Sequence, residues 1–211
     1  MRFKNYYLHE AVVYPEGFNV KELHNIKSFA GKQRYVASHL EKLGSGSARV
    51  VYKIDDKHVL KLAKNVKGLA QNSVEGDYSM HTYYSFIPEL IDVDDDYIWI
   101  IKERINKITR KEFEKLSGYK FDDFSMMLKK YINDRTTNRK LPWVVDKDKY
   151  EEFIDDEFIS ELSDFIINYD LEVGDIGGSI NNWGKSTKQN DTPVLADVGL
   201  SKSVWSNHYK K

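Results

Sequence analysis

The feature that most constrains the fold of this sequence is that strand-type and helix-type residue patterns lie in separate parts of the chain. Most of the short runs rich in β-branched residues, bounded by turn residues, lie within about 43–102, whereas the sequence from about Glu103 onward is mostly helical in its spacing of apolar residues. Strands first and helices after is the order typical of an α+β protein. The 211 residues are enough for one large domain or two small lobes. We therefore expect an α+β fold with a hinge at 102–105.

The strand-rich part contains a glycine-rich turn, Leu43-Gly44-Ser45-Gly46-Ser47, inside a meander of three strands. An acidic turn at 94–96 predicts a further hairpin. The strands are expected at 49–54, 59–63, 88–93 and 97–102, and helices at 32–42, 67–81, 121–131 and 150–167.

The helix at 150–167 has the clearest pattern of the second part. Ile154, Phe158, Leu162 and Phe165 recur at three and four residues, so we expect one long helix that buries this face. A polar loop is expected at 168–187. A short strand at 192–196 then runs into Asp197-Val198-Gly199.

Composition narrows the classes of function. The formal net charge of −1 makes a nucleic-acid partner unlikely, and the absence of cysteine excludes disulfides, thiolate metal sites and cysteine nucleophiles. The six histidines are scattered without metal-ligand spacing, which favours surface or packing roles. No apolar run is long enough to span a bilayer, and the N-terminus lacks a signal-peptide pattern. We expect a cytoplasmic protein without a membrane partner.

Two features of the strand-rich part suit phosphate binding. Glycines such as Gly44 and Gly46 let backbone N–H groups approach phosphate oxygens, although a plain β-turn explains them about as well. Lys61 lies in an apolar strand, flanked by Leu60 and Leu62, where a buried ammonium needs an anion. The alternative is that strand alternation points Lys61 to water.

Two aspartates follow in the helical part. Asp175 heads a loop that contains Asn181 and Asn182, where a carboxylate can take a proton from an attacking hydroxyl. Asp197 ends the last strand, and a carboxylate there with a loop carboxamide supplies the hard oxygen ligands that suit Mg²⁺. Taken singly, an aspartate before glycine is most often a turn residue.

The order of these features resembles the protein-kinase fold, over about 43–200. Less specific motifs, at 26–30, 62–65 and 70–72, are similar to those of small kinase-like proteins encoded by tailed bacteriophages. The resemblance implies two lobes: a small antiparallel β N-lobe at 43–104 and a truncated, mainly helical C-lobe at 105–211. An extension with a helix, at 1–42, precedes them.

The resemblance also implies roles for individual residues. Gly44, Ser45 and Gly46 would cover the phosphates of ATP, and Lys61 would bond the α- and β-phosphates, with Glu75 as its ion-pair partner. Backbone groups around Lys102 and Glu103 would meet the adenine. Asp175 would act on the acceptor hydroxyl. Asp197, with Asn181 or Asn182, would bind Mg²⁺. We expect Lys61, Glu75, Asp175 and Asp197 to converge on one cleft.

Several positions depart from the family's pattern. Arg49 stands at the third glycine of the loop, and Val173 stands two residues before Asp175, where protein kinases usually carry histidine. Ile180 occupies the position of the loop asparagine, and Val198 replaces the phenylalanine of Asp-Phe-Gly. Because Lys211 follows shortly after Asp197, we expect neither a full activation segment nor the helices that hold a peptide substrate.

Three functions therefore stay open. The first is a phosphotransferase that moves the γ-phosphate of ATP to a hydroxyl of a protein or small molecule. The second is an inactive pseudokinase that serves as a phage particle-associated or host-interaction protein, with host or phage proteins as partners and the host cytoplasm or virion as its location. The third is an α+β binding module unrelated to kinases, in which the motifs coincide by chance.

Overall fold

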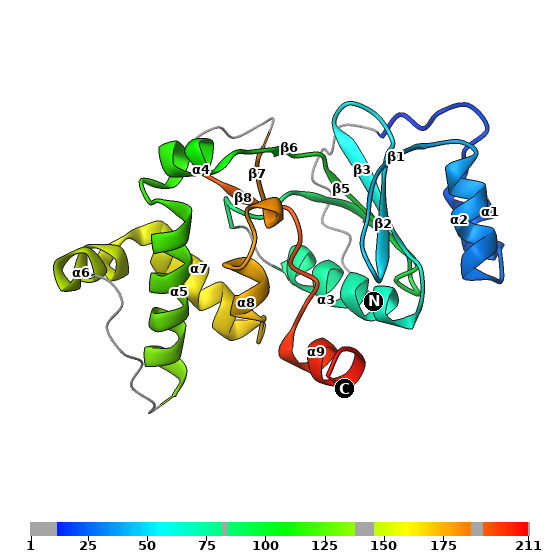
Figure 1. The fold of residues 1–211 in the computed structure, drawn as a ribbon. Coiled ribbons are helices and arrows are strands. Elements are labelled where there is room, and N and C mark those ends of the chain that lie inside the picture. The colour runs from blue at the N-terminus through cyan, green and yellow to red at the C-terminus, as the bar shows by residue number, and fades with distance from the viewer. Residues whose placement is uncertain (1–11, 82–83, 138–145, 187–191, 211) are drawn as a thin grey trace. The chain divides into compact units, whose positions relative to one another are not determined.

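The structure is a computed structural model that describes residues 12–81, 84–137, 146–186 and 192–210, and it confirms the α+β class (Figure 1). The chain divides into two compact units, Met1–Asn72 with Glu89–Arg104 and Ser73–Pro88 with Ile105–Lys211. Among the described helices, none is both long and apolar enough to cross a bilayer.

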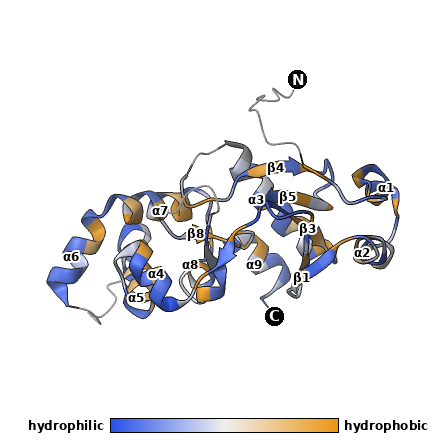
Figure 2. Ribbon diagram, turned by 90° about the horizontal axis from the view of Figure 1, so that it is seen from above, coloured by the Kyte–Doolittle hydropathy of each residue, from blue (hydrophilic) through white to orange (hydrophobic). Residues whose placement is uncertain are grey.

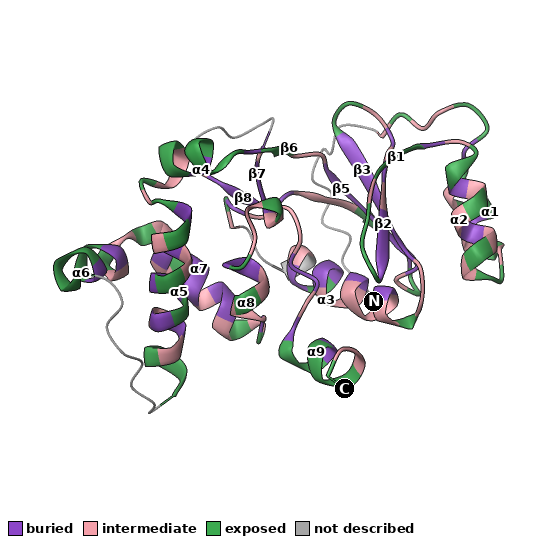
Figure 3. Ribbon diagram, viewed as in Figure 1, coloured by how far each residue is buried: buried purple, intermediate pink, exposed green. Residues whose placement is uncertain are grey.

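The first unit is built on a five-stranded antiparallel sheet in the order β1-β2-β3-β5-β4. Its strands are β1 (Glu41–Ser45), β2 (Arg49–Lys53), β3 (His58–Ala63), β4 (Leu90–Val93) and β5 (Trp99–Glu103). All six residues of the central strand β3 are buried, as are all five of β5 (Figure 3). The expected meander and the second hairpin are confirmed.

Two short helices complete the core of the first unit. Helix α1 (Val20–Asn25) begins at an Asn19 cap, and α2 (Phe29–Ala37) begins where the Ser28 hydroxyl accepts from the Gly31 N–H group. The expected helix at 32–42 was therefore placed too late, and α1 was missed. Leu43, just after the expected helix, lies in β1 and is 38% exposed. Residues of these helices pack with the sheet in one apolar cluster: Phe18, Leu23, Val36, Leu40, Val50, Tyr52, Ile54, Leu60, Leu62, Ile98, Trp99 and Ile101.

Helix α3 (Val66–His81) extends across the division between the units at Asn72. Its first turn approaches the sheet closely at Gly68. A Cβ atom there would lie 2.4 Å from the Ala48 carbonyl oxygen and 3.0 Å from the Ala63 Cβ. Packing therefore requires the glycine that weakens the helix in the sequence.

The second unit is mainly helical. Its helices are α4 (Arg110–Ser117), α5 (Phe121–Thr136), α6 (Lys147–Asp155), α7 (Glu157–Asn168), α8 (Val173–Ile176), a 3₁₀ turn (Ile180–Asn182) and α9 (Lys202–His208). A small antiparallel sheet in the order β6-β7-β8 joins Asn106–Lys107, Trp183–Lys185 and Val194–Leu195. The helices carry hydrophobic residues on part of their surface only (Figure 2).

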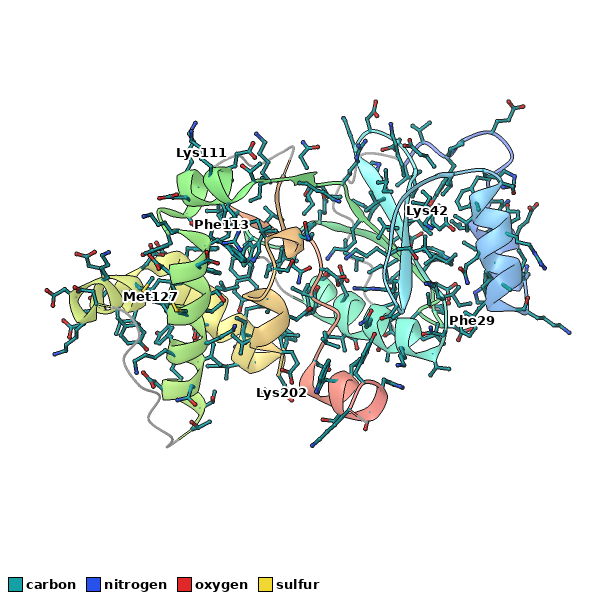
Figure 4. The ribbon with its side chains drawn as sticks, in the orientation of Figure 1. Phe29, Lys42, Lys111, Phe113, Met127 and Lys202 are labelled. Carbon is teal, nitrogen blue, oxygen red and sulfur yellow. The ribbon has the colours of Figure 1, made fainter. Side chains whose placement is uncertain are left out.

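Aromatic rings form the centre of this second unit. Phe113 is fully buried, and its ring lies 5.0 Å from Phe124 and 5.2 Å from Trp183, centroid to centroid. In Figure 4, Phe113 points inward from α4 while Lys111 of the same helix points outward. Edge-to-face contacts of this kind add to the burial of apolar area. This core fixes β7, and hence the loop before it.

The long helix expected at 150–167 is two helices. Asp156 has extended backbone angles (φ −72°, ψ 127°), and its carboxylate caps α7 by accepting from the Ile159 N–H group at 3.1 Å. The break changes which residues face the core. Phe153 and Ile159 are fully buried, whereas Ile154 and Phe158 are half-buried. Leu162 and Phe165 are fully buried, as expected.

The segment expected as a loop at 168–187 is more ordered than its composition indicates. It holds α8, the 3₁₀ turn and β7, and only its last residue lies outside the described part of the chain. The Trp183 indole N–H group donates to the Ile176 carbonyl oxygen at 2.9 Å, which joins β7 to α8.

Candidate functional site

The glycine-rich turn lies between β1 and β2 of the first unit. Gly44 is in β1 opposite Val51, and the Gly46 N–H group donates to the Arg49 carbonyl oxygen at 2.9 Å. A Cβ atom at Gly44 would meet nothing within 4 Å among the described residues, and at Gly46 only a backbone oxygen at 3.9 Å. Packing within the described chain therefore does not require either glycine, and the described residues leave space beside both.

Arg49 follows this turn and is directed inward. It is buried at 5% exposure, and its Nη1 atom donates to the Asn72 side-chain oxygen at 3.2 Å. The arginine at the third glycine position thus makes a contact with α3.

Lys61 is buried at 5% exposure in the middle of β3, opposite Val51 on one side and Ile100 on the other. This burial excludes the alternative in which Lys61 points to water. Burying an ammonium is costly unless it is paired, so the position is chemically unusual for a strand residue. Glu75, its expected partner, is fully buried on α3. Lys61 belongs to the first unit and Glu75 to the second, so their pairing stays a prediction.

The end of β5, where we expected adenine contacts, is already paired. The Glu103 N–H group donates to the Glu89 carbonyl oxygen at 2.9 Å, and the Arg104 N–H group donates to the Lys57 carbonyl oxygen at 2.6 Å. Lys102 pairs with Val59 in β3. An adenine donor or acceptor would have to use other backbone groups of this segment.

The second unit brings together the predicted loop residues. Asp175 lies in α8, and the Asn182 amide donates to its backbone carbonyl at 2.7 Å and to its carboxylate at 3.4 Å. Asn181 is exposed, and only its backbone N–H contact to the Ser179 hydroxyl is described. Of the two asparagines that the sequence leaves open, Asn182 is the one beside Asp175. The 3₁₀ turn thus places the side chain two residues beyond Ile180 beside Asp175.

Backbone hydrogen bonds align the segment that carries Asp197 with this loop. The Ala196 N–H group donates to the Asn182 carbonyl oxygen at 2.8 Å, and the Glu172 N–H group donates to the Leu200 carbonyl oxygen at 3.0 Å. Asp197 is half-buried, while Val198 beside it is 1% exposed and packs in the apolar core. Val198 thus anchors this segment in the apolar core.

These residues offer the donor set of a magnesium site. Asp197 supplies a carboxylate, and Asn182 supplies a carboxamide oxygen because its NH₂ group is directed at Asp175. Both are hard oxygen ligands of the kind that Mg²⁺ prefers. The Asp175 carboxylate, which we expect to accept a proton, lies 3.4 Å from the Asn182 amide nitrogen. The expected convergence of these residues with Lys61 stays a prediction, since Lys61 belongs to the other unit.

Sequence spacing missed one cluster of possible metal ligands in the first unit. Ligand atoms of His24, Asp94 and Asp96 lie within 4.8 Å of one another. His24 Nδ1 lies 2.6 Å from an Asp94 carboxylate oxygen, and this hydrogen bond raises the pKa of His24 above its usual value. Lys32, whose ammonium donates to the Leu23 and His24 carbonyl oxygens, adds a positive charge nearby. Helix α1 and the β4–β5 turn are 70 residues apart in sequence, so no local motif could reveal this cluster.

A hollow of about 440 Å³ lies beside this cluster in the first unit, lined by His24, Asn25, Ile26, Lys27, Phe29, Lys32, Leu69, Asp96 and Ile98. None of the residues predicted to bind nucleotide or metal lines this hollow.

Comparisons with known proteins give structural similarities only. No protein-family model matches the sequence, and the curated proteins give no match. A ternary complex of APH(2″)-IIa with streptomycin and ATP is 14% identical, with a TM-score of 0.38, over 83% of this chain and 73% of that chain. A choline/ethanolamine kinase family protein from Mesorhizobium loti is 13% identical, with a TM-score of 0.36, over 80% of this chain and 64% of that protein's chain. ADP-bound aminoglycoside phosphotransferase APH(2″)-Ib is 16% identical, with a TM-score of 0.34, over 85% of this chain and 72% of that protein's chain. At these TM-scores and identities, the similarities do not decide the activity of the chain.

Proposed function

We propose that this protein binds ATP with Mg²⁺ and transfers the γ-phosphate to a hydroxyl group of a protein or small molecule. The observation that carries the proposal is the assembly of Asp175, Asn182 and the Asp197 segment by hydrogen bonds in the second unit. The buried Lys61 and the open glycine-rich turn of the first unit support it. These features follow one another in the order that the protein-kinase resemblance requires.

Each residue has a role in this reaction. The backbone of Gly44, Ser45 and Gly46 contacts the phosphates, and the Lys61 ammonium holds their oxygens. Asp175 accepts the proton of the acceptor hydroxyl as its oxygen bonds to the γ-phosphorus and the bond to the β-phosphate oxygen breaks, releasing ADP. Asp197 and Asn182 would hold Mg²⁺, which when bound neutralises phosphate charge.

The second candidate is a pseudokinase that binds nucleotide without transferring phosphate, and acts through a phage or host protein partner. The observation that favours it is Val173, which begins α8 where protein kinases usually carry histidine. Arg49 also occupies a glycine position of the phosphate loop.

Paired carboxamide variants of the two aspartates test the proposal. Asp197→Asn should abolish transfer and weaken Mg²⁺-dependent ATP binding, because it removes the charged metal ligand. Asp175→Asn should lower turnover about 10²- to 10⁴-fold while ATP binding stays within about twofold, because this carboxylate acts on the acceptor. Transfer is measured with labelled ATP against serine and threonine peptides, streptomycin, kanamycin, choline and ethanolamine, and ATP binding by calorimetry.

The exposed Asp148→Asn, on α6, is the control and should leave both measurements unchanged. ATP binding by the wild type without transfer to any acceptor would instead favour the pseudokinase.

A further inference from the structure

The glycine-rich turn is held from one side by the residue that follows β3. The Lys64 N–H group donates to the Ala48 carbonyl oxygen at 2.8 Å. The Lys64 ammonium donates to the Gly46 carbonyl oxygen at 2.8 Å and to the Ser45 hydroxyl at 3.3 Å. One residue therefore contacts the turn at two points and the residue after it, Ala48, at a third.

Asn65 extends these contacts to helix α3. Its amide nitrogen donates to the Ser47 carbonyl oxygen at 3.2 Å, and its amide oxygen accepts from the Gly68 N–H group at 3.2 Å. The second bond is that of an N-cap, which satisfies a donor in the first helical turn. A single carboxamide thus joins the glycine-rich turn to the start of the helix.

The first two turns of α3 are in turn fixed against the sheet. Gly68 allows the helix to approach the Ala48 carbonyl so closely that a side chain would not fit. The fully buried Asn72 accepts from Arg49 and donates to the Tyr97 carbonyl oxygen at 2.9 Å. The start of α3 could not move away from the turn without breaking several buried or backbone contacts, so the two form one rigid body within the first unit.

We propose that residues 64–72 act as a clamp that holds the glycine-rich turn in its phosphate-binding conformation before the nucleotide arrives. The inference rests on the proposed function, because it assigns this turn to phosphate. Ordering a flexible loop at the moment of binding lowers affinity, so a loop that is ordered in advance binds more tightly. Asn65 is the positioning residue of the clamp, since it alone of these side chains contacts both the turn and α3 through one group.

Asn65→Ser tests the clamp with little disturbance of the helix. Serine is as good an N-cap as asparagine, but it lacks the amide donor that reaches the Ser47 carbonyl. Hydrogen exchange of the amides at 45–48, measured without nucleotide, should become faster by roughly two- to tenfold, the effect of one ordinary hydrogen bond. The affinity for ATP should fall by a similar factor, whereas the affinity for adenosine, which has no phosphate, should not change.

Asn19→Ser is the matched control, because Asn19 caps α1 in the same unit and its side chain accepts from the Lys21 N–H group. It should leave both the exchange and the ATP affinity unchanged. Unchanged exchange at 45–48 in Asn65→Ser would overturn the clamp. Faster exchange with unchanged ATP affinity would overturn its role in binding. If the wild type does not bind ATP, the proposed function fails, while the exchange measurement still decides whether the clamp exists.

Discussion

Buried charge is the main residue-scale signal in the first unit. Lys61, Arg49 and Lys32 are each 5% exposed although their side chains are cationic. Arg49 contacts Asn72, and Lys32 contacts backbone carbonyl oxygens, so both have structural roles. Lys61 lies in the central strand, and the proposal assigns its charge to nucleotide phosphates. The sequence alone could not show that the Lys61 side chain is buried, because strand alternation allows it to point either to the core or to water.

The choice between Asn181 and Asn182 also shows the limit of sequence spacing. The spacing of the protein-kinase motif that the sequence resembles points to Ile180, and both asparagines lie close to that position. The Ser179 hydroxyl caps a 3₁₀ turn at this point, and β7 starts at Trp183. These two features together direct the Asn182 amide at Asp175. The decision depends on the geometry of one turn, which residue types in the sequence do not specify.

The pair of His24 and Asp94 predicts a pH dependence of stability. The hydrogen bond to Asp94 raises the pKa of His24 in the folded protein, with Asp96 adding to the effect and Lys32 opposing it. A raised folded-state pKa stabilises the protein fully below the unfolded value of about 6.5, and this stabilisation is lost as the pH rises through the folded-state pKa. The midpoint of thermal unfolding of the wild type should therefore exceed that of His24→Gln by more at pH 5.5 than at pH 9.

His208→Gln is the control, because His208 lies in the last turn of α9 in the other unit. A difference between wild type and His24→Gln that grows with rising pH would contradict this account of the ion pair.

At the scale of elements, strands were predicted better than helix ends. The runs at 49–54 and 59–63 are bounded by glycine and aspartate turns, and the structure places β2 and β3 within one residue of them. The helical pattern of apolar residues is continuous over 150–167, yet the helix is interrupted at Asp156. The break depends on a side chain that caps the next helix and accepts from the Tyr119 hydroxyl at 3.1 Å. Periodicity carries no information on such a tertiary contact.

The break makes Phe153 more important for stability than Phe158. Phe153 is fully buried, with its ring 5.1 Å from Tyr119 and 6.1 Å from Phe124. Phe153→Ala should lower the free energy of unfolding by roughly 3–5 kcal/mol. Phe158→Ala should cost about 1–2 kcal/mol, because part of its ring already contacts water. Urea denaturation measures both, and equal losses would mean that the two helices share the continuous face that the sequence predicts.

At the scale of the whole molecule, each of the two units has its own apolar core. The glycine-rich turn and Lys61 belong to the first unit. Asp175, Asn182 and Asp197 belong to the second, and α3 contributes residues to both. The sequence predicts this distribution because strands and helices are segregated along the chain. It does not predict that residues 73–88 group with the helical unit, since that depends on Tyr78 and Phe86 packing against Phe165.

The central claim is that the buried Lys61 serves a bound nucleotide. Calorimetric titration with ATP and Mg²⁺, on wild type and Lys61→Met, tests it most directly, with the exposed Lys42→Met of β1 as the control. Wild type and Lys42→Met should bind ATP. Lys61→Met should bind it about 10- to 100-fold more weakly, the effect of a lost charged hydrogen bond. The account would be contradicted if the wild type does not bind ATP at millimolar concentration. It would also be contradicted if Lys61→Met binds ATP as tightly as the wild type does.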